Sequence, residues 1–458
     1  MIRQLSFGNF KSFKHQPAID LAPISIFIGP NNSGKSTILQ TLLLIKQTVE
    51  CRYDELAVDI SGPYYDFGTY KDMVFGNDLK RHISMSITAD RHNHVAKNND
   101  TVGWTFEIAS KNGGKQITVR RFGSHLNDCK MLDVRFNPRS EISRADIAVP
   151  EGGRKTIRRK QTLNELFYRS NFAVFFANPH AFMRILGHGN LSGAKASSKL
   201  TLNNNQAKLL KNIQQQYYDH TLRGLFRSMS YVGPLREAPQ RLYSYRGHDM
   251  NLVGVKGENF FAVLSRFSDR RSQKSKAVRR QIAKWLRLSG LAKNVEIKQI
   301  SPRHFEVRVL GISGTKYQNL VDVGFGNSQV LPIAIDALQS RPGSVHIYEQ
   351  PEIHLHPKAQ CALADLLVTL KRNGAQAIVE THSFELILRL KRMLASGRIR
   401  HQDLVIYYVD QKNGLGRIKK LILDENLAFT NWPKGFFEER YNESHQLTMQ
   451  MLKKHHLS

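Results

Sequence analysis

The alternation of apolar and polar positions predicts that the first 120 residues fold mainly as β-strands. Residues 82–88 and 103–108 alternate with a period of two, which is typical of strands with one buried face. The apolar, β-branched run at 24–28 predicts a further strand, and the spacing of apolar residues at 37–49 predicts a helix shortly after it. The N-terminal part of the chain is therefore expected to be rich in strands.

The pattern changes twice further along the chain, which indicates how the domains are arranged. It becomes largely helical from about residue 160 to 290, with a Ser/Asn-rich hinge at 192–205, and strands and helices then alternate from 295 to about 423. A chain of 458 residues is long enough for two or three lobes. We expect an α/β fold in four segments, which are an N-terminal half at 1–120, an inserted, mainly helical and basic lobe at 121–294, a C-terminal half at 295–425 and a tail at 426–458.

A glycine-rich turn joins the predicted strand at 24–28 to the helix that follows. It fits the phosphate-binding pattern G-x-x-x-x-G-K-[ST] at every defined position. Backbone N–H groups at a helix N-terminus favour phosphate, Lys35 would reach the β- and γ-phosphates, and the Ser36 hydroxyl would ligate Mg²⁺. The alternative is a tight turn without a ligand. The candidate nucleotide-binding residues are Gly29, Pro30, Asn31, Asn32, Ser33, Gly34, Lys35, Ser36 and Thr37.

The acidic partner of this turn lies more than three hundred residues further along the chain. The apolar run at 345–348 predicts a strand that ends in Glu349-Gln350-Pro351-Glu352. A carboxylate such as that of Glu349 can hold Mg²⁺ directly or through water. In a compact nucleotide switch the matching acid follows within a few dozen residues. The long separation therefore indicates that a whole lobe is inserted between two halves of one site.

Two further motifs lie in the same C-terminal region. Residues 322–329 form a glycine-rich stretch before a helix at 330–338, which on its own is a weak signal for a second anion site. The strand at 377–379 ends in Glu380-Thr381-His382-Ser383, so His382 is expected at the sheet edge where α/β proteins bind ligands. The candidate residues of the first motif are Gly326, Asn327, Ser328 and Gln329.

The charge of the chain predicts attraction to polyanions. Its formal net charge is +29 and its pI is near 10.1. The basic residues cluster at 154–160 and at 270–287, where Val278, Ile282, Trp285 and Leu286 form one apolar helix face opposite a basic one. A solvated surface helix, contact with a phosphate backbone and an acidic protein partner all remain open for this face.

No compositional signal points to a membrane or to secretion. The start of the chain lacks the apolar stretch of a signal peptide, and no run of about eighteen apolar residues occurs. The three cysteines, Cys51, Cys129 and Cys361, are scattered and match neither a disulfide framework nor zinc spacing. We expect a cytoplasmic protein.

The order of the motifs resembles an ABC-type ATPase head of the kind shared by SMC proteins, RecF and OLD-family nucleases. Phosphate loop, signature turn, Walker B strand and switch histidine follow one another in that order. Several short sequence segments are similar to those of the OLD-like AAA ATPases of bacterial antiphage systems, which include the ATPases of PARIS and Septu. That similarity rests on residues 9–13, 62–72, 233–236, 349–357, 380–383, 407–409 and 432–437, and it is poor over about 120–225.

The resemblance implies a mixed sheet with flanking helices, a β-rich N-terminal lobe and a shared ATP site. In such heads ATP lies between two subunits, so Ser328, with the N–H groups of Gly326 and Asn327, would cap the γ-phosphate of the partner's nucleotide. His382 would contact the γ-phosphate and sense it. The implied cofactors are ATP and Mg²⁺, and the implied assembly is a homo-oligomer that holds ATP between its protomers.

Two departures from the family pattern shape the functional hypothesis. ABC heads place a catalytic glutamate where this chain has Gln350, which can orient water but cannot accept its proton. Glu352 could act as the base if its loop approaches, and slow hydrolysis is expected. The catalytic candidates are thus Gln350, Glu352 and His382.

The second departure is the absence of a Toprim nuclease segment. About 75 residues follow His382, and they contain no D-x-D cluster. Glu438-Glu439 favours a helix start, and His354 and His356 favour a structural turn over a metal pair. A nuclease, Toprim-like or HNH-like, would have to be a separate polypeptide.

Two function classes follow. The first is an ATPase sensor and scaffold in a two-component antiphage system, where the basic lobe would meet nucleic acid or a DNA-mimicking acidic phage protein. The alternative is a RecF- or SMC-like DNA-binding ATPase in DNA repair that clamps duplex DNA. A transporter ATPase is a weak third hypothesis, because nothing in the sequence resembles a coupling partner.

Overall fold

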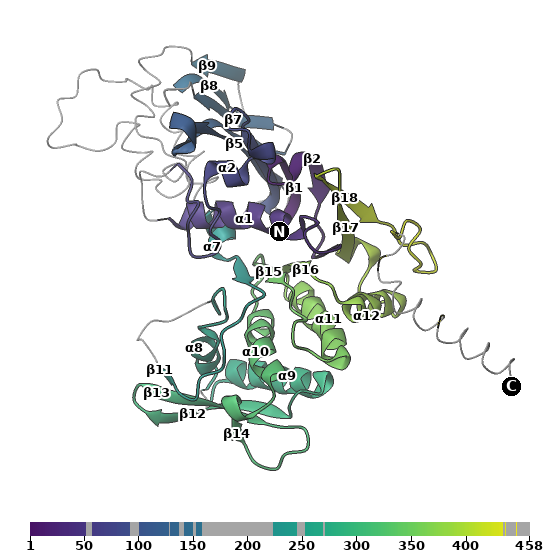
Figure 1. Cartoon of the computed structure of the whole chain (residues 1–458). Helices are drawn as coiled ribbons and strands as arrows, with labels where there is room; N and C mark the ends of the chain where they lie inside the picture. Colours follow the sequence, from purple (N-terminus) through teal and green to yellow (C-terminus); the bar gives the residue numbers. More distant parts are fainter. Residues whose placement is uncertain are drawn as a thin grey trace, which may run out of the picture.

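The computed structural model describes residues 1–51, 57–91, 100–127, 129–136, 142–149, 153–157, 223–244, 252–268 and 271–433, together with 436 and 446. Within these residues the chain forms three sheets with helices packed around them (Figure 1). The Ser/Asn-rich hinge predicted at 192–205 and the pair Glu438-Glu439 lie outside the described residues, as does most of the tail predicted at 426–458.

A six-stranded sheet joins the two ends of the chain. Its strands are β10 (Ser230–Val232), β15 (Val345–Glu349), β16 (Gln376–Glu380), β3 (Ile24–Ile28), β17 (Leu404–Lys412) and β18 (Leu415–Leu421), in that spatial order. All neighbours are parallel except β17 and β18. Every residue of β3 and β16 is buried, as continuous apolar strands in the middle of a parallel sheet should be. The sheet thus brings segments more than three hundred residues apart into direct hydrogen bonding.

Two hydrophobic cores lie on opposite faces of this sheet. Side chains alternate along β3, so that Phe27 enters one core while Ile26 and Ile28 enter the other. The first core also contains helix α1 (Lys35–Glu50), and the second contains α10 (Phe325–Leu338) and α11 (Pro357–Arg372). The phosphate-binding turn between β3 and α1 is therefore fixed by packing on both sides of the sheet.

An eight-stranded antiparallel sheet forms the upper lobe in Figure 1. Its strands follow the order β2 (Phe13–Asp20), β1 (Ile2–Phe10), β4 (Ile83–Arg91), β5 (Asp100–Lys111), β6 (Gln116–Leu126), β7 (Cys129–Phe136), β8 (Ile142–Val149) and β9 (Gly153–Ile157). The short helix α2 (Tyr70–Met73) lies beside it, and α7 (Arg223–Arg227) packs against α1. The prediction of a β-rich N-terminal part is confirmed.

The expectation of a mainly helical lobe at 121–294 is wrong for its first part. Strands β6, β7, β8 and β9 continue the N-terminal sheet in this part of the chain. The prediction of helices was wrong because charged and polar residues interrupt the period-two alternation that would have indicated strands in this stretch. The basic run at 154–160 begins within β9, and residues 158–160 lie outside the described part of the chain.

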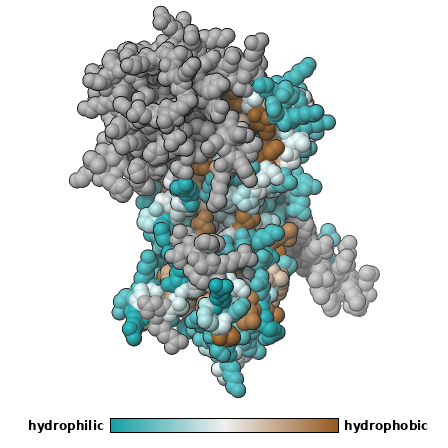
Figure 2. All heavy atoms as spheres, turned by 90° about the vertical axis from the view of Figure 1, so that its left-hand side faces the viewer, coloured by the Kyte–Doolittle hydropathy of each residue, from teal (hydrophilic) through white to brown (hydrophobic). Residues whose placement is uncertain are grey.

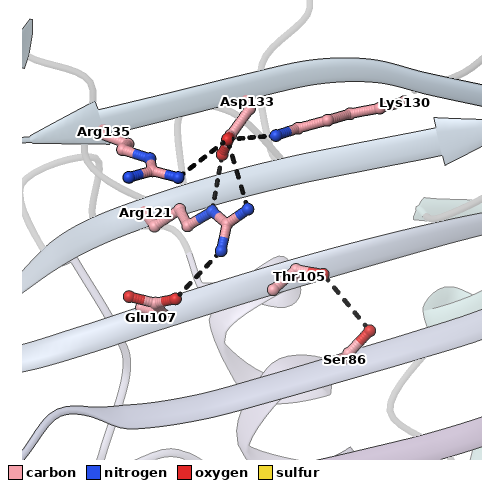
Figure 3. Close-up of polar contacts among 7 residues, drawn as sticks. All are labelled: Ser86, Thr105, Glu107, Arg121, Lys130, Asp133 and Arg135. Carbon is pink, nitrogen blue, oxygen red and sulfur yellow. Dashed lines mark hydrogen bonds and ion pairs between the residues drawn. The ribbon is translucent and has the colours of Figure 1, made fainter. Parts of the chain in front are cut away.

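Cross-strand ion pairs hold β5, β6 and β7 together (Figure 3). The Asp133 carboxylate is 1% exposed and accepts hydrogen bonds from Arg121, at 2.7 Å to its Nε, and from Lys130, with Arg135 3.6 Å away. Burial opposes ionisation, but the bonds from Arg121 and Lys130 outweigh it and lower the pKa of Asp133. A buried charge on an internal strand of the sheet is thus neutralised locally.

A smaller sheet and several helices make the lower lobe. The strands are β11 (Tyr243–Ser244), β13 (His304–Leu310) and β12 (Asn294–Ser301), with β14 (Gln318–Asn319) paired to β13. The helices are α8 (Phe260–Ser265), α9 (Gln273–Ser289), α10 and α11, while α12 (Phe384–Ala395) packs on α11. Figure 2 shows hydrophobic atoms gathered low on the face toward the viewer, amid a mostly hydrophilic surface. No helix in the described ranges is both long and apolar enough to cross a bilayer.

The basic amphipathic helix predicted at 270–287 is confirmed as α9. Ile282, Trp285 and Leu286 are buried, Val278 is partly buried, and the Trp285 indole N–H donates to the carbonyl of Ala362 at 2.8 Å. The α/β class predicted from the sequence is also confirmed. One helix boundary moves, because α10 begins at Phe325 and not at residue 330, so the signature residues form its first turn.

Candidate nucleotide-binding site

The phosphate-binding turn needs both of its flanking glycines. A Cβ atom on Gly29 would lie 2.0 Å from the carbonyl oxygen of Val409. Gly34 has a φ of 97°, and its Cβ would lie 2.9 Å from the Phe13 ring. Only glycine tolerates such close approach and such a backbone angle. The fold therefore requires glycine at the same two positions at which the phosphate-binding pattern has it.

Lys35 lies over the carbonyl oxygens of the same turn. Its Nζ donates to the carbonyls of Pro30 at 2.7 Å and Gly29 at 3.1 Å, and it stands 4.0 Å from Oε1 of Glu380. Burial lowers the pKa of this lysine, while the carboxylates of Glu380, Glu352 and Glu349 oppose that change. An anion that entered the turn would give the ammonium group a stronger partner than two neutral carbonyls.

A polar pocket of about 610 Å³ opens in front of this turn, a volume in the range of small-molecule sites. The Oγ atoms of Ser12 and Ser33 are buried without a hydrogen-bond partner. Such groups are satisfied when a ligand with acceptor oxygens binds. The lining residues are Lys11, Ser12, Asn31, Asn32, Ser33, Gly34, Lys35, Ser36, Thr37, Gln40, Gln350, Glu380 and Gln411.

Lys11 is a pocket residue that the sequence reasoning did not select. Its Nζ donates to Oε1 of Gln40 at 2.6 Å and lies 4.6 Å from the centre of the Tyr65 ring. Burial lowers its pKa to about 8, although Glu349 opposes the change. The stretch 9–13 contributed to the resemblance but carries no chemical pattern of its own. Only the fold places Lys11 beside the phosphate-binding turn.

Two carboxylates meet at the ends of neighbouring strands. Glu349 and Glu380 are partners in the register of β15 and β16. Glu349 accepts a hydrogen bond from the Tyr231 hydroxyl at 2.7 Å, whereas Glu380 lines the pocket and its buried Oε2 has no hydrogen-bond partner. Burial, reinforced by the charge of Glu349, raises the pKa of Glu380 to about 7. Glu380 was missed as a site residue, although its position just before Thr381 and His382 at a strand end is the signal that points to it.

The chemistry of these groups fits a magnesium ion. Mg²⁺ prefers oxygen ligands and is usually held by one or two carboxylates together with phosphate oxygens and water. Ser36, Glu349 and Glu380 offer a hydroxyl and two carboxylates, and the orphaned Oε2 of Glu380 lacks any other partner. No group of three or more His, Cys, Asp or Glu side chains suited to a metal occurs among the described residues, so ATP would have to supply further ligands.

Gln350 lies on the pocket wall and is held through its backbone. Its N–H donates to the carbonyl of Glu380 at 2.8 Å, and its carbonyl accepts from Nη2 of Arg236 at 3.0 Å. Its φ of 45° is unusual for a residue with a side chain. Arg236 is buried, with Nε and Nη1 unpartnered, and burial lowers its pKa to about 10. The glutamine side chain is thereby presented to the pocket from a fixed backbone.

Glu352 and His382 form a second contact behind the pocket wall. Oε1 of Glu352 accepts the backbone N–H of His382 at 2.6 Å, and neither residue lines the pocket. Burial raises the pKa of Glu352, while the hydrogen bond from His382 opposes this change. Burial and the charge of Lys35 lower the pKa of His382 to about 4, so its imidazole is neutral near pH 7. This geometry fits a role of Glu352 in positioning the His382 loop better than a role as the catalytic base.

The signature residues lie apart from the pocket of their own chain. None of Gly326, Asn327, Ser328 and Gln329 lines it. The Ser328 hydroxyl donates to the carbonyl of Phe325 at 2.7 Å, and Oδ1 of Asn327 is buried without a partner. Phe325 itself is 48% exposed. Gly324 and Phe325 are thus at the surface, whereas Asn327, Ser328 and Gln329 behind them are buried.

The two histidines of the 349–357 stretch have structural contacts. The Nδ1 atom of His356 accepts the backbone N–H of Ala359 and caps α11. The ring of His354 packs edge-on against Phe325, with ring centres 5.0 Å apart. The contact of His354 links the Walker B loop to the first turn of α10. The two contacts give both histidines a role without a metal.

Two family models match the sequence. A model described as an AAA ATPase domain matches residues 1–222, and one described as an AAA domain, putative AbiEii toxin, Type IV TA system, matches residues 170–389. Each match covers slightly less than half of the chain, and together the two matches span residues 1–389. The comparison with curated proteins found no match.

Several solved structures share the general arrangement. The SMC head bound to the C-winged helix domain of ScpA aligns with a TM-score of 0.47 and 12% identity, over 93% of this chain and 98% of that chain. The SMC head domain from Thermotoga maritima aligns with a TM-score of 0.41 and 13% identity, over 92% of this chain and 99% of that one. These likenesses are too distant to assign a role.

Proposed function

We propose that this chain binds ATP with Mg²⁺, hydrolyses it slowly and closes as a homo-oligomer around it. The pocket at the phosphate-binding turn carries the proposal, because Lys35, Ser36 and Glu380 converge there with two unsatisfied serine hydroxyls. Gln350 occupies the wall where a catalytic glutamate would stand in related heads. Glutamine orients water without accepting its proton, so the bound state should be long-lived.

The oligomer follows from the position of the signature turn. In a single chain the first turn of α10 lies outside the pocket, and its N–H groups would favour the phosphate of a second copy. Each ATP-binding site would then consist of Ser328 from one protomer and Lys35 from the other. Within this arrangement His382, neutral near pH 7, can donate a hydrogen bond to the γ-phosphate.

The biological role that we propose is that of a sensor and scaffold in a two-component antiphage system. The description of the second family model, AAA domain, putative AbiEii toxin, Type IV TA system, supports this proposal. The chain would hold a separate Toprim-like or HNH-like nuclease and release it when a phage signal arrives. ATP binding, with little turnover, would keep the assembly in its holding state.

The test of the nucleotide switch is Lys35→Ala. Removal of the ammonium group should abolish ATP binding, measured by isothermal titration, and the antiphage activity measured by plaque counts. Native purification should recover a nuclease with the wild-type chain. A variant that binds ATP and protects cells as the wild type does would contradict the switch. Steady-state hydrolysis at roughly tens per second would contradict slow turnover.

A DNA-binding ATPase of the RecF or SMC type is the second candidate. The observation in its favour is the net charge of +29, which attracts a phosphate backbone. The two candidates differ in their partners. ATP-dependent retention on closed circular duplex DNA, without a nuclease among the co-purifying proteins, would favour the repair clamp.

A further inference from the structure

A second pocket, of about 520 Å³, lies in the lower lobe between α9, the end of α8 and β12. Four cations of one helix line it, which are Lys276, Arg279, Arg280 and Arg287. Their side chains have no ion-pair or hydrogen-bond partner among the residues that the structure describes. Among the described lining residues the only carboxylate is that of Glu296, whose Oε1 is 3.8 Å from Nη1 of Arg308. The described lining therefore carries an excess of positive charge.

The floor of this pocket is apolar. Leu264, Ile282, Ala283 and Val295 are each at most 8% exposed, yet they line the hollow together with the partly buried Ile297. An occupant that brought only negative charge would leave this aliphatic surface in contact with water. An occupant that brought only apolar groups would leave four cations unpaired. The pocket suits a ligand that combines the two.

We propose that this pocket binds an acidic segment of a partner protein, with one bulky apolar side chain in the hollow and flanking carboxylates on the cations of α9. A nucleic-acid backbone offers anions but no aliphatic group for the floor. Of the two aromatic residues on the wall, Phe267 is 8% exposed and offers little ring face for base stacking, while Tyr317 is half-buried and its hydroxyl accepts a hydrogen bond from Asn294 at 2.8 Å. The mixed lining thus selects a peptide over a nucleic-acid strand.

The site can communicate with the nucleotide machinery through packing. Helix α9 packs against α10, whose first turn carries the signature residues, and against α11 through Trp285. The inference deepens the proposed function by giving the sensor a place for an acidic partner. Its test needs no nucleotide, so it can fail or succeed independently of the ATP switch.

The experiment compares two pairs of substitutions on the same helix. Lys276→Ala with Arg280→Ala removes two lining cations, whereas Lys274→Ala with Lys284→Ala removes two exposed cations that do not line the pocket. The probe is a fluorescent peptide of repeated Glu-Glu-Leu, and its competitors are a repeated Glu-Glu-Ser peptide and oligo-dT of equal charge. Binding to the full-length chain is followed by fluorescence anisotropy at low and physiological salt.

We expect the leucine peptide to bind in the micromolar range and the lining pair to weaken it at least tenfold, with a much smaller effect of the exposed pair. Replacement of leucine by serine should also weaken binding several-fold. Equal losses in both pairs would assign the attraction to bulk charge. Tighter binding of oligo-dT, equal affinity of the two peptides, or no binding at about 1 mM would overturn the proposal.

Discussion

At the scale of single residues, the structure distinguishes two glutamates that look interchangeable in the sequence. Glu352 lies in the Walker B loop, and Glu380 precedes the switch histidine. Each has one buried oxygen without a hydrogen-bond partner, but Glu380 lines the nucleotide pocket, whereas Glu352 does not line it and its Oε1 accepts the His382 N–H. Glu380 is therefore placed to share a metal ion with ATP, and Glu352 is placed to hold a loop.

Glu380→Gln should weaken the effect of Mg²⁺ on ATP affinity by about tenfold or more, because a neutral amide is a poorer Mg²⁺ ligand than a carboxylate. The fold should be kept, since the substitution removes a buried charge that Glu349 already repels. Isothermal titration of ATP with and without Mg²⁺ measures the effect. Glu352→Gln serves as the control and should retain the Mg²⁺ dependence. An unchanged Mg²⁺ dependence in Glu380→Gln would exclude it as a ligand.

Asp403 should make the stability of the chain depend on acid pH. Burial alone would raise its pKa, but hydrogen bonds from Arg400 and Lys371 lower it from 3.8 to about 2. Because the folded-state pKa is the lower one, the stabilisation is complete above about pH 4 and is lost as the pH falls toward 2. Asp403→Asn should cost on the order of 2 kcal/mol near neutral pH, read from urea midpoints. The difference from wild type should shrink below about pH 4, and a pH-independent difference would contradict this cause.

The sequence predicted those residues whose type and order carry the chemistry. The phosphate-binding turn could be read directly, because its glycines, lysine and hydroxyl lie in one short segment. Lys11 and Glu380 could not, since each reaches the pocket from a different part of the chain, and neither could Arg236, which holds the backbone of Gln350. Their chemistry depends on the order of strands in the sheet, which no local pattern encodes.

At the scale of elements, a buried polar network ties the signature helix to the central sheet. Asp336 of α10 accepts hydrogen bonds from Ser230 of β10 at 2.8 Å, from Tyr348 of β15 at 2.8 Å and from the Nδ1 atom of His346 at 2.6 Å. All four side chains lie in the protein interior. The network is complete, and such networks fix the relative placement of the elements they join.

Asp336→Ala should destabilise the protein by about 3 kcal/mol or more, because it leaves three buried donors without an acceptor. Asp322→Ala is a matched control in the same lobe, since the Asp322–Arg241 ion pair is 44% and 63% exposed and should contribute under about 1 kcal/mol. Chemical denaturation of both variants measures the contrast. Equal and small losses would show that the network can rearrange around the missing carboxylate.

Among the elements, the hydrophobic pattern of the sequence predicted some correctly and missed others. Helices α1 and α9 form where the periodicity predicts them, and α9 buries one apolar face, whereas α1 is buried along nearly its whole length. Strands β6 to β9 were not predicted, since their polar and charged positions are satisfied across strands, as in the pairing of Arg121 with Asp133. Cross-strand partners become apparent only when the register is known.

At the scale of the whole molecule, the two halves of the nucleotide site should come from two copies of the chain. Gly324, just before α10, offers a clean probe of this arrangement. Its φ is −51°, and a Cβ there meets nothing within 4 Å, so Gly324→Asp should fold normally with aspartate as a favourable N-cap. Its carboxylate would repel a phosphate at the start of α10. Lys35→Ala disables the other half of the site.

Each variant alone should be inactive in ATP hydrolysis, because every site in its homodimer lacks one half. When equal amounts are mixed, half of the dimers are mixed, and each of these contains one intact site formed by the unaltered Lys35 of one chain and the unaltered Gly324 of the other. Hydrolysis should then return to about a quarter of the wild-type rate if sites act independently. If both halves came from the same chain, every site in the mixture would keep one defect, so a mixture without activity would contradict assembly in trans.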